Sequence, residues 1–433
     1  MKSVWLDTQT LPAFSPLRED VETDVLVIGG GLTGLLCAYQ LQQKGIACVV
    51  AEADTIMSGT SGNTTAKITS QHGLIYTKLV RRFGKQTAAL YYQANQQAIG
   101  EYRRLAQRYP CDFAFQDAFV YTCGDMAEVK REYLLAKLIG GRAYLEKNLP
   151  LPMPVTGAVR FPEQAQFHPV KFAAQIAKEL TIYEHTMVKQ LRGTVGETDG
   201  GTIRAKHVIV ATHFPFVNRR GLYFMKLYQQ RSYVLGLKTG KPLSGMYLDA
   251  VENGLSFRMA GELLLLGGGG HRTGKKGGGF QSLKDAADRL YPNGEVVYHW
   301  AAQDCMTLDD LPYIGPYSPN MQNVYVATGF GKWGMTNAMV SALLLRDLIL
   351  GEKNPWAEVF APRRRMLRPQ LGVNLLETTG HLLRPTVPRC SHLGCALNWN
   401  KAEHTWDCPC HGSRFREDGS VMDNPAMRNI KEL

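Results

Sequence analysis

The segment DVLVIGGGLTG (residues 24–34) decides the fold of the first three quarters of the chain. Residues 24–28 form a short apolar run, which is typical of a strand buried in a parallel sheet. A helical pattern follows the glycines to about residue 44, and a second apolar run at residues 47–51 ends at Glu52. This order of elements predicts a β–α–β unit of the kind that binds dinucleotides.

Three glycines of this segment have the G-x-G-x-x-G spacing of a dinucleotide-binding turn: Gly29, Gly31 and Gly34. The first allows a tight turn, the second lets the backbone approach a pyrophosphate, and the third lets the helix pack closely on the sheet. The helix start at Leu32 and Thr33 offers free N–H groups to the phosphates. Glu52 is expected to accept hydrogen bonds from ribose hydroxyls. Because FAD and NAD share this pattern, other segments must decide between them.

Composition and charge exclude several classes of protein. Hydrophobic residues make up 45% of the 433 positions and charged residues 20%, as in globular proteins. No run of about 18 apolar residues could span a membrane, and the polar arm over residues 1–22 lacks the apolar core of a signal peptide, so the expected location is the cytoplasm. The net charge is +11, but the densest basic run, Arg363–Arg365 with Arg368, has no interleaved aromatics. We expect a solvated hinge there and no nucleic-acid partner.

Four of the nine cysteines lie within 21 positions, whereas the other five are scattered and are expected to be small buried hydrophobes. Such clustering indicates a metal centre. The pattern C-x-H…C-x-x-H supplies four candidate ligands: Cys390, His392, Cys408 and His411. In a Rieske [2Fe–2S] centre two cysteines hold one iron and two histidines hold the other. Zinc is the alternative, but it does not explain the two additional cysteines, Cys395 and Cys410.

Several segments in this order resemble the FAD-binding fold of the D-amino-acid oxidase, glycine oxidase and sarcosine oxidase superfamily over roughly residues 22–355. They are the first β–α–β unit, the small and hydroxylated residues 58–67, the stretch 166–169, a strand that ends at Ala211-Thr212, and a late strand followed by residues 329–335. In that family the late segment lies near the flavin, and the region of Glu184 and Val188 binds the adenine side through its backbone.

The resemblance therefore implies FAD as a cofactor. The positions implied to bind it are Gly29, Gly31, Leu32, Thr33, Gly34, Glu52, Ala53, Gly59, Thr60, Ser61, Thr64, Thr65, Ala66, Lys67, Val188, Ala211, Thr212, Gly329, Gly331, Lys332, Trp333, Gly334 and Met335.

The two ligand loops, residues 390–395 and 408–413, resemble those of the high-potential Rieske proteins of respiratory and photosynthetic quinol-oxidising complexes. The resemblance implies a disulfide between Cys395 and Cys410, and residues 424–426 resemble the proline loop that covers the cluster. Two features depart from the pattern. Only about 25 residues separate Arg365 from the first ligand loop, so the domain is short, and Phe415 stands where relatives carry a tyrosine.

The expected fold is an α/β FAD-binding Rossmann-like domain with an inserted α+β substrate domain, followed by a small all-β Rieske domain. The expected boundaries are 1–22 for the arm, 23–365 for the oxidoreductase and 366–433 for the Rieske domain. Within the oxidoreductase, FAD-binding parts are expected at about 23–75, 160–215 and 300–355, and substrate parts at 76–159 and 216–299. Residues 76–145 are expected to be mostly helical. Residues 222–299 are expected to form strands interrupted by a glycine-rich loop that reaches Gly279.

Both cofactors together predict a flavin-dependent oxidoreductase that passes electrons through the cluster to an acceptor protein or a quinone. The family resemblance implies an amine or amino acid as the electron donor. Two alternatives stay open: an NAD(P)H-dependent reductase, with Gly267–Gly270 as a weak nucleotide-site candidate, and a non-catalytic electron-transfer or redox-sensing protein. No catalytic residue is assigned. Arg258 is a candidate carboxylate partner and His271 a candidate base, beside the simpler interpretations of a surface ion pair and a loop histidine.

Overall fold

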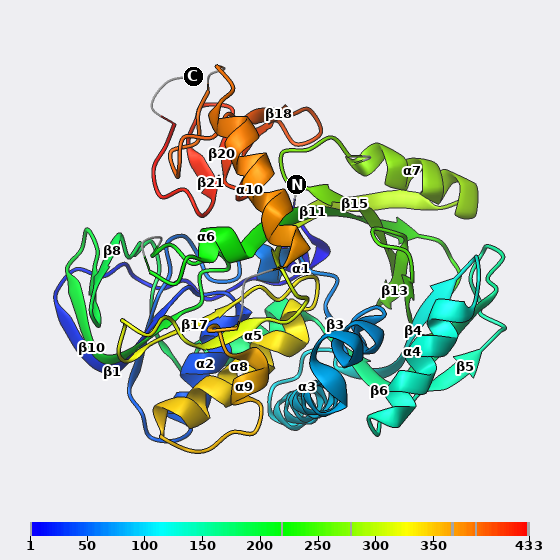
Figure 1. The fold of residues 1–433 in the computed structure, drawn as a ribbon, viewed down its shortest axis with the longest axis horizontal. Coiled ribbons are helices and arrows are strands. Elements are labelled where there is room, and N and C mark those ends of the chain that lie inside the picture. Colours follow the sequence, from blue (N-terminus) through cyan, green and yellow to red (C-terminus); the bar gives the residue numbers. More distant parts are fainter. Residues whose placement is uncertain (1, 218–219, 278, 365–367, 386–387, 431–433) are drawn as a thin grey trace.

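The computed structural model describes residues 2–217, 220–277, 279–364, 368–385 and 388–430, which form two large sheets and one small sheet (Figure 1). The first sheet has β1 (Val21–Ile28) at its centre, with β2 (Cys48–Ala51) and β10 (Thr202–Val210) parallel to it on either side. The helix α2 (Leu32–Gln42) connects β1 to β2, so the predicted β–α–β unit is confirmed. Residues 25–28 of β1 are fully buried because both faces of the strand are covered.

The rest of the first sheet extends outward from these strands in the order β16-β17-β10-β1-β2-β7. The strands β7 and β17 run parallel to their neighbours, β16 is an antiparallel edge, and a short hairpin adds to β10. The bounds are β7 (Thr181–Tyr183), β8 (Gln190–Arg192), β9 (Val195–Glu197), β16 (Tyr313–Pro316) and β17 (Val324–Thr328). Two helices complete this part of the fold, namely α5 (Pro169–Ala177) and α8 (Gly334–Ile349), the second packed on α2.

The second sheet has nine strands in the order β15-β11-β14-β13-β12-β4-β6-β3, with β5 paired to β6. Its strands are β3 (Lys67–Ile68), β4 (Ala114–Thr122), β5 (Tyr144–Glu146), β6 (Gly157–Gln166), β11 (Leu227–Lys238), β12 (Met246–Asp249), β13 (Ser256–Ala260), β14 (Leu263–Arg272) and β15 (Glu295–Thr307). The associated helices are α3 (Ile75–Arg108), α4 (Ala127–Leu138), α6 (Tyr223–Lys226) and α7 (Gly279–Leu290).

The third sheet forms the C-terminal domain and lies at the top of Figure 1, above β11 and α6. Its four antiparallel strands are β18 (Asn398–Asn400), β19 (Thr405–Asp407), β20 (Arg414–Arg416) and β21 (Val421–Asp423). Two helices precede it, α9 (Ala357–Phe360) and α10 (Pro369–Leu382). Phe415 is fully buried in the small core of this domain, together with the four clustered cysteines.

The stretch 76–145 is mostly helical, as expected, because α3 and α4 span most of it, with β4 at residues 114–122 between them. One expectation about local structure was wrong. The run Gly267–Gly270 lies inside β14, which pairs with β11 and β13, and is not part of a loop. The N-terminal arm contains the helix α1 (Val4–Thr8) and a buried Trp5, whose indole donates to the carbonyl of Thr64 at 2.7 Å.

The expected solvated hinge is exposed at Arg363 but not at Arg364. The guanidinium of Arg364 is 10% exposed, pairs with Asp309 at 3.0 Å and lies 4.4 Å above the ring of Tyr313. Arg365 lies outside the described residues, as does the expected boundary between the two domains. Within the described ranges no helix is both long and apolar enough to cross a membrane.

We predict that Gly34→Ala destabilises the protein, because a Cβ there would lie 1.9 Å from the carbonyl oxygen of Gly29. The helix α2 would have to move off the sheet, at a cost of about 1–3 kcal/mol or more. Thermal or urea unfolding measures this. The matched control is Gly100→Ala in α3, where a Cβ meets nothing within 4 Å and alanine should add about 0.5–1 kcal/mol of stability. Equal effects of both changes would contradict the close packing of α2.

Candidate functional site

The four candidate cluster ligands lie on two loops of the same shape, which we call the first cluster loop (390–395) and the second cluster loop (408–413). In the first, the N–H of Gly394 donates to the carbonyl of Cys390 at 2.9 Å. In the second, the N–H of Gly412 donates to the carbonyl of Cys408, also at 2.9 Å. Both glycines have positive φ, +79° and +84°, so the paired turns depend on glycine at these positions.

The turns bring the ligand side chains together. The rings of His392 and His411 lie 5.0 Å apart and are nearly perpendicular. Burial lowers the pKa of His392 to about 4 and of His411 to about 3, so both imidazoles are neutral, the form that binds metals. The Nδ1 atom of His411 is buried without a hydrogen-bond partner among the described residues, as expected of a nitrogen that needs a metal. These residues therefore fit a [2Fe–2S] cluster of the Rieske type.

The expected disulfide is not supported. Cys395 and Cys410 are both free thiols, and their sulfur atoms form a group with that of Cys408 within 4.8 Å. The two cysteines nevertheless face each other between the loops, as the resemblance implied.

A cavity of about 980 Å³ lies where the carboxyl ends of β1, β2, β10 and β17 meet the second sheet. That volume is at the upper end of the range for small-molecule sites, about 300–1,000 Å³. All but three of the expected FAD-binding positions line it. They are Gly29, Gly31, Thr33, Glu52, Ala53, Gly59, Thr60, Ser61, Thr64, Thr65, Lys67, Val188, Ala211, Thr212, Gly329, Gly331, Lys332, Trp333, Gly334 and Met335.

The three other positions lie behind the cavity wall. The N–H of Leu32 donates to the hydroxyl of Ser61 at 3.0 Å, Gly34 packs on Gly29, and the carbonyl of Ala66 accepts from Arg258 at 2.7 Å. Glu184 also lies outside the cavity lining. Its carboxylate accepts from the backbone N–H of Ile56 at 2.7 Å and of Phe14 at 2.9 Å, so it holds neighbouring segments in place.

The glycine-rich end of the cavity fits a dinucleotide. Gly31 faces the cavity, and a Cβ added there would lie 3.1 Å from the hydroxyl oxygen of Ser61. The carboxylate of the half-buried Glu52 accepts from the N–H of Gly30 at 2.5 Å and of Asp54 at 2.9 Å. Burial raises the pKa of Glu52, although its backbone donors oppose that shift. A half-buried carboxylate at this point of a β–α–β unit suits the ribose hydroxyls of FAD.

The opposite end of the cavity carries charged side chains: Lys67 and Lys332, which were among the expected positions, and Asp304, which the sequence did not indicate. Burial raises the pKa of Asp304 to about 6, opposed by Lys332 and Arg231. Lys332 donates to the side chain of Asn253 at 2.9 Å. Lys67 donates to the carbonyl of Tyr247 at 3.1 Å, and burial lowers its pKa to about 7.

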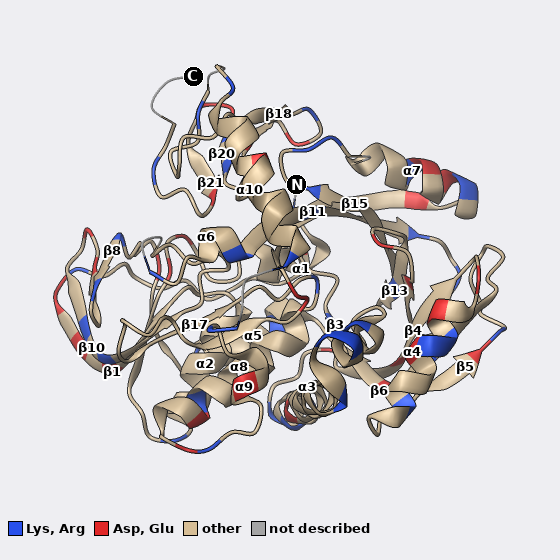
Figure 2. Ribbon diagram, viewed as in Figure 1, with Lys and Arg blue, Asp and Glu red and all other residues tan. Residues whose placement is uncertain are grey.

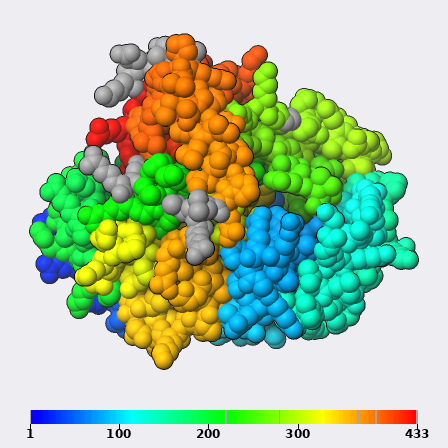
Figure 3. All heavy atoms as spheres, in the orientation of Figure 1, coloured from blue at the N-terminus to red at the C-terminus, as the bar shows by residue number. Residues whose placement is uncertain are grey.

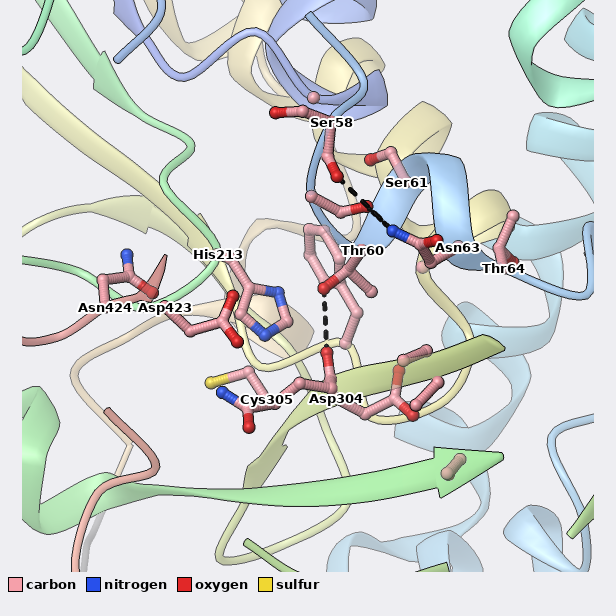
Figure 4. Close-up of a pocket in the computed structure, with 18 of the residues that line it drawn as sticks. Ser58, Thr60, Ser61, Asn63, Thr64, His213, Asp304, Cys305, Asp423 and Asn424 are labelled. Carbon is pink, nitrogen blue, oxygen red and sulfur yellow. Dashed lines mark hydrogen bonds between the residues drawn. The ribbon is translucent and has the colours of Figure 1, made fainter. Parts of the chain in front are cut away.

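The C-terminal domain supplies part of the cavity wall. Asp423, Asn424 and Ala426 line it, and Figure 4 shows Asp423 beside His213, the residue that follows Thr212. The amide of Asn424 donates to the carbonyls of Thr212 at 2.5 Å and Phe214 at 2.8 Å. The segment that resembles a proline loop therefore binds the oxidoreductase beside the strand β10. No sequence pattern indicated this contact, because its two sides are about 200 residues apart.

Two buried glutamines join the second cluster loop to the cavity wall. The side-chain N–H groups of Gln229 donate to the carbonyl of His411 at 2.9 Å and of Asn424 at 3.0 Å. Those of Gln303 donate to the carbonyl of Gly412 at 2.8 Å and to the side-chain oxygen of Gln229 at 2.7 Å. The backbone carbonyl of Gln303 accepts from the hydroxyl of Thr60 at 2.9 Å, on the cavity side (Figure 4).

A buried ion network makes a second connection between the domains. Glu403 pairs with Arg231 of β11 and, at 2.9 Å, with Arg414 of β20, which also contacts Asp407 at 2.9 Å. Burial alone would raise the pKa of Glu403, but the two guanidinium groups lower it overall. Because these charges are buried, removal of one partner would leave another uncompensated.

Arg258 and His271, the two candidate catalytic residues, do not lie where they could bind or deprotonate a substrate. Arg258 is buried and donates to the carbonyls of Thr65 and Ala66, both at 2.7 Å. It is neither a surface ion pair nor free for a substrate carboxylate. The ring of His271 stacks on Tyr233 at 5.7 Å, and its Nδ1 contacts the carbonyl of Gly269 at 3.4 Å. It lies outside the cavity lining and is not placed as a base.

Comparisons with known proteins agree with this division of the chain. The family model for FAD dependent oxidoreductases (DAO) matches residues 24–348, and the model for the Rieske [2Fe-2S] domain matches residues 369–433. A Bacillus subtilis (strain 168) protein named for a Rieske 2Fe-2S iron–sulfur centre, YhfW, is 34% identical over 495 aligned positions, which cover 100% of this chain and 97% of the relative.

Each half also has its own relatives. The crystal structure of glycine oxidase from Geobacillus kaustophilus superposes with a TM-score of 0.67 and 21% identity, over 80% of this chain and 99% of that one, and shows the fold. The cytochrome b6-f complex iron-sulfur subunit 3 of Nostoc sp. (strain PCC 7120) is 38% identical over 97 residues, 21% of this chain and 54% of that protein. FAD and a Rieske cluster are thus the cofactors, and the chain belongs to the DAO family of FAD-dependent oxidoreductases, with a C-terminal Rieske domain.

Proposed function

We propose that this enzyme oxidises a small amine or amino acid at the cavity and delivers the electrons within the same chain to the Rieske domain, which passes them to an external acceptor. The observation that carries this proposal is the buried contact of Gln229 and Gln303 with the second cluster loop. These glutamines lie on β11 and β15, and Gln303 also lines the cavity. The cluster site is therefore held against the wall of the FAD site.

The substrate class rests on the family. Glycine oxidase of Geobacillus kaustophilus matches this chain in sequence as well as in fold, at 24% identity over 75% of the chain. When bound, FAD would accept two electrons from the substrate and supply them singly. The chain's own part is to hold the dinucleotide at the glycine-rich end and to enclose the substrate among the charged groups at the opposite end, including Lys67, Asp304 and Lys332.

The fold of Gly267–Gly270 does not favour the alternative, an NAD(P)H-dependent reductase with its nucleotide site at these glycines. A phosphate-binding turn needs a helix start after the glycines, whereas Gly267–Gly270 continues as a strand to Arg272 with a neighbour on each side. We place the protein in the cytoplasm, where clustered cysteines and histidines are more often a metal centre than a disulfide framework.

We predict that an amine or an amino acid, and not NADH, reduces the bound flavin. The measurement is anaerobic stopped-flow absorbance against a panel of secondary amines and amino acids, with NADH and NADPH as controls. Reduction of the flavin by NADH alone would reverse the assignment, and reduction by none of them would favour a redox-sensing role.

We predict one Rieske-type paramagnetic signal with stoichiometric iron and acid-labile sulfide. His411→Ala should abolish the signal, because it removes one of two nitrogen ligands. The matched control is His404→Ala, an exposed histidine on the loop between β18 and β19, which should retain the signal. Stoichiometric zinc without sulfide would end the assignment of the cluster.

We predict that Gln303→Leu slows reduction of the cluster relative to reduction of the flavin. The change removes the donor to the carbonyl of Gly412 and to the side-chain oxygen of Gln229. It also removes the acceptor of the Thr273 hydroxyl. Each buried group left unpaired costs about 1–3 kcal/mol. Rapid-freeze paramagnetic resonance measures the cluster, and hydrogen exchange of residues 408–413 measures the loosened loop.

The matched control for Gln303→Leu is Gln281→Leu, which removes an exposed glutamine from α7. It should change neither the rate of cluster reduction nor the exchange of the second cluster loop. Normal exchange and normal cluster reduction in Gln303→Leu would show that the glutamine pair does not hold the loop.

A further inference from the structure

The helix α10 packs on the protein with its polar face. The side chain of Asn374 accepts from Arg272 at 3.0 Å, and Glu377 pairs with Lys275 at 2.6 Å. Further along the same face, His381 is buried and its carbonyl accepts from the N–H of Ala396 at 3.0 Å. These positions recur every three or four residues, so they share one side of the helix. A surface helix normally buries its apolar side instead.

The outer face of α10 is apolar and exposed. The side chains of Leu376 and Leu383 are 76% and 78% exposed, far more than a leucine in a packed helix. The exposed apolar residues on this helix, its end and the adjacent first cluster loop are Val373, Leu375, Leu376, Leu382, Leu383 and Leu393, which we call the apolar patch. The helix lies on the face of the molecule turned toward the viewer in Figure 3. Contiguous exposed leucines of this kind mark an interaction surface.

The apolar patch is continuous with the cluster. The guanidinium of Arg389 donates to the carbonyl of Leu382 at 3.4 Å and to that of Gly394 at 2.7 Å, so the end of α10 is tied to the first cluster loop. The second cluster loop is the one that faces the cavity. A partner on the apolar patch would therefore lie beside the outer side of the cluster site.

The charges around the apolar patch are positive. The only carboxylate in α10 is that of Glu377, which is turned inward to Lys275, and α10 is mostly tan in Figure 2. Arg384 and Arg428 are exposed and form no ion pair within the described ranges. Arg428 is adjacent to the first cluster loop, since its carbonyl accepts from the hydroxyl of Ser391 at 2.5 Å.

We propose that the apolar patch binds the surface of an anionic lipid bilayer. A helix with an exposed apolar face can lie in the bilayer plane with that face among the acyl chains, as interfacial helices do, and the flanking Arg384 and Arg428 supply the basic residues. Anionic lipid attracts such basic residues. The proposal rests on the proposed function in one respect: the acceptor of the cluster's electrons would then be held in the membrane.

Two other occupants fit the apolar patch less well. A second copy of the chain would bring the same arginines together across a twofold axis, and the net charge of +11 opposes self-association. A protein partner normally engages aromatic anchors, whereas the apolar patch holds only aliphatic side chains.

The test is cosedimentation of the full-length, cofactor-loaded protein with vesicles of equal parts phosphatidylglycerol and phosphatidylcholine. We expect binding to these vesicles, weak binding to phosphatidylcholine alone, and reduced binding at about 1 M salt, where charges are screened over about 3 Å. Leu376→Gln with Leu383→Gln should lower the partition coefficient about tenfold or more, because two exposed leucines that would enter the acyl chains are lost.

The matched control is Leu134→Gln with Leu138→Gln, which removes two leucines of α4 that are also exposed, at 63% and 50%. It should bind like the unaltered protein. Absence of vesicle binding, or equal binding of the two double variants, would overturn the proposal. The proposal would also be overturned if the unaltered protein and the α4 variant were dimers in size-exclusion chromatography and the α10 variant a monomer. That result would assign the apolar patch to a second copy. Flavin-to-cluster transfer, measured without vesicles in the same preparations, tests the proposed function separately.

Discussion

The close approach of Gly412 to Gln229 fixes where the cluster site lies relative to the cavity. A Cβ at Gly412 would lie 2.5 Å from the Cβ of Gln229, and a Cβ at Gly274 would lie 2.6 Å from the backbone nitrogen of Pro409. Gly412 thus lets the second cluster loop approach the side chain of Gln229, and Gly274 lets the backbone of the oxidoreductase meet the backbone at Pro409. Any side chain at either position would push the second cluster loop away from β11 and lengthen the path to the cavity. The position of the second cluster loop relative to the cavity depends on these contacts.

The shortness of the Rieske domain follows from the same interface. The chain has the helix α10 before the first cluster loop, and the four strands of the domain enclose only a small core. Burial comes instead from the oxidoreductase, through Glu403 shared between Arg231 and Arg414 and through the two glutamines. Such buried polar groups are costly unless all are satisfied, so the two domains require each other's partners. The Rieske domain is part of the cavity wall as well as an electron carrier.

The features that could be predicted from the sequence are those whose geometry is local. The β–α–β unit and the cluster ligands depend on spacings within about 30 residues, and most expected FAD positions line one cavity because strand ends of a parallel sheet share an edge. What failed depends on distant partners. Arg258 binds carbonyls of residues 65–66, the glycines 267–270 became a strand because β11 and β13 flank them, and no pattern in the sequence connects Gln229 with His411.

The two cluster loops are equivalent in shape but not in surroundings, and this asymmetry gives the domain a direction. The second cluster loop, with His411, is buried against the cavity wall. The first cluster loop, with His392, carries the exposed Leu393 and adjoins α10 at the surface. An enzyme that takes electron pairs from a substrate and releases them singly needs separate entry and exit sides, so that the acceptor never competes with the substrate for the cavity. Because α10 is the element that precedes the first cluster loop, the outer side of the domain is covered by one helix, and the proposed function uses that side for the acceptor.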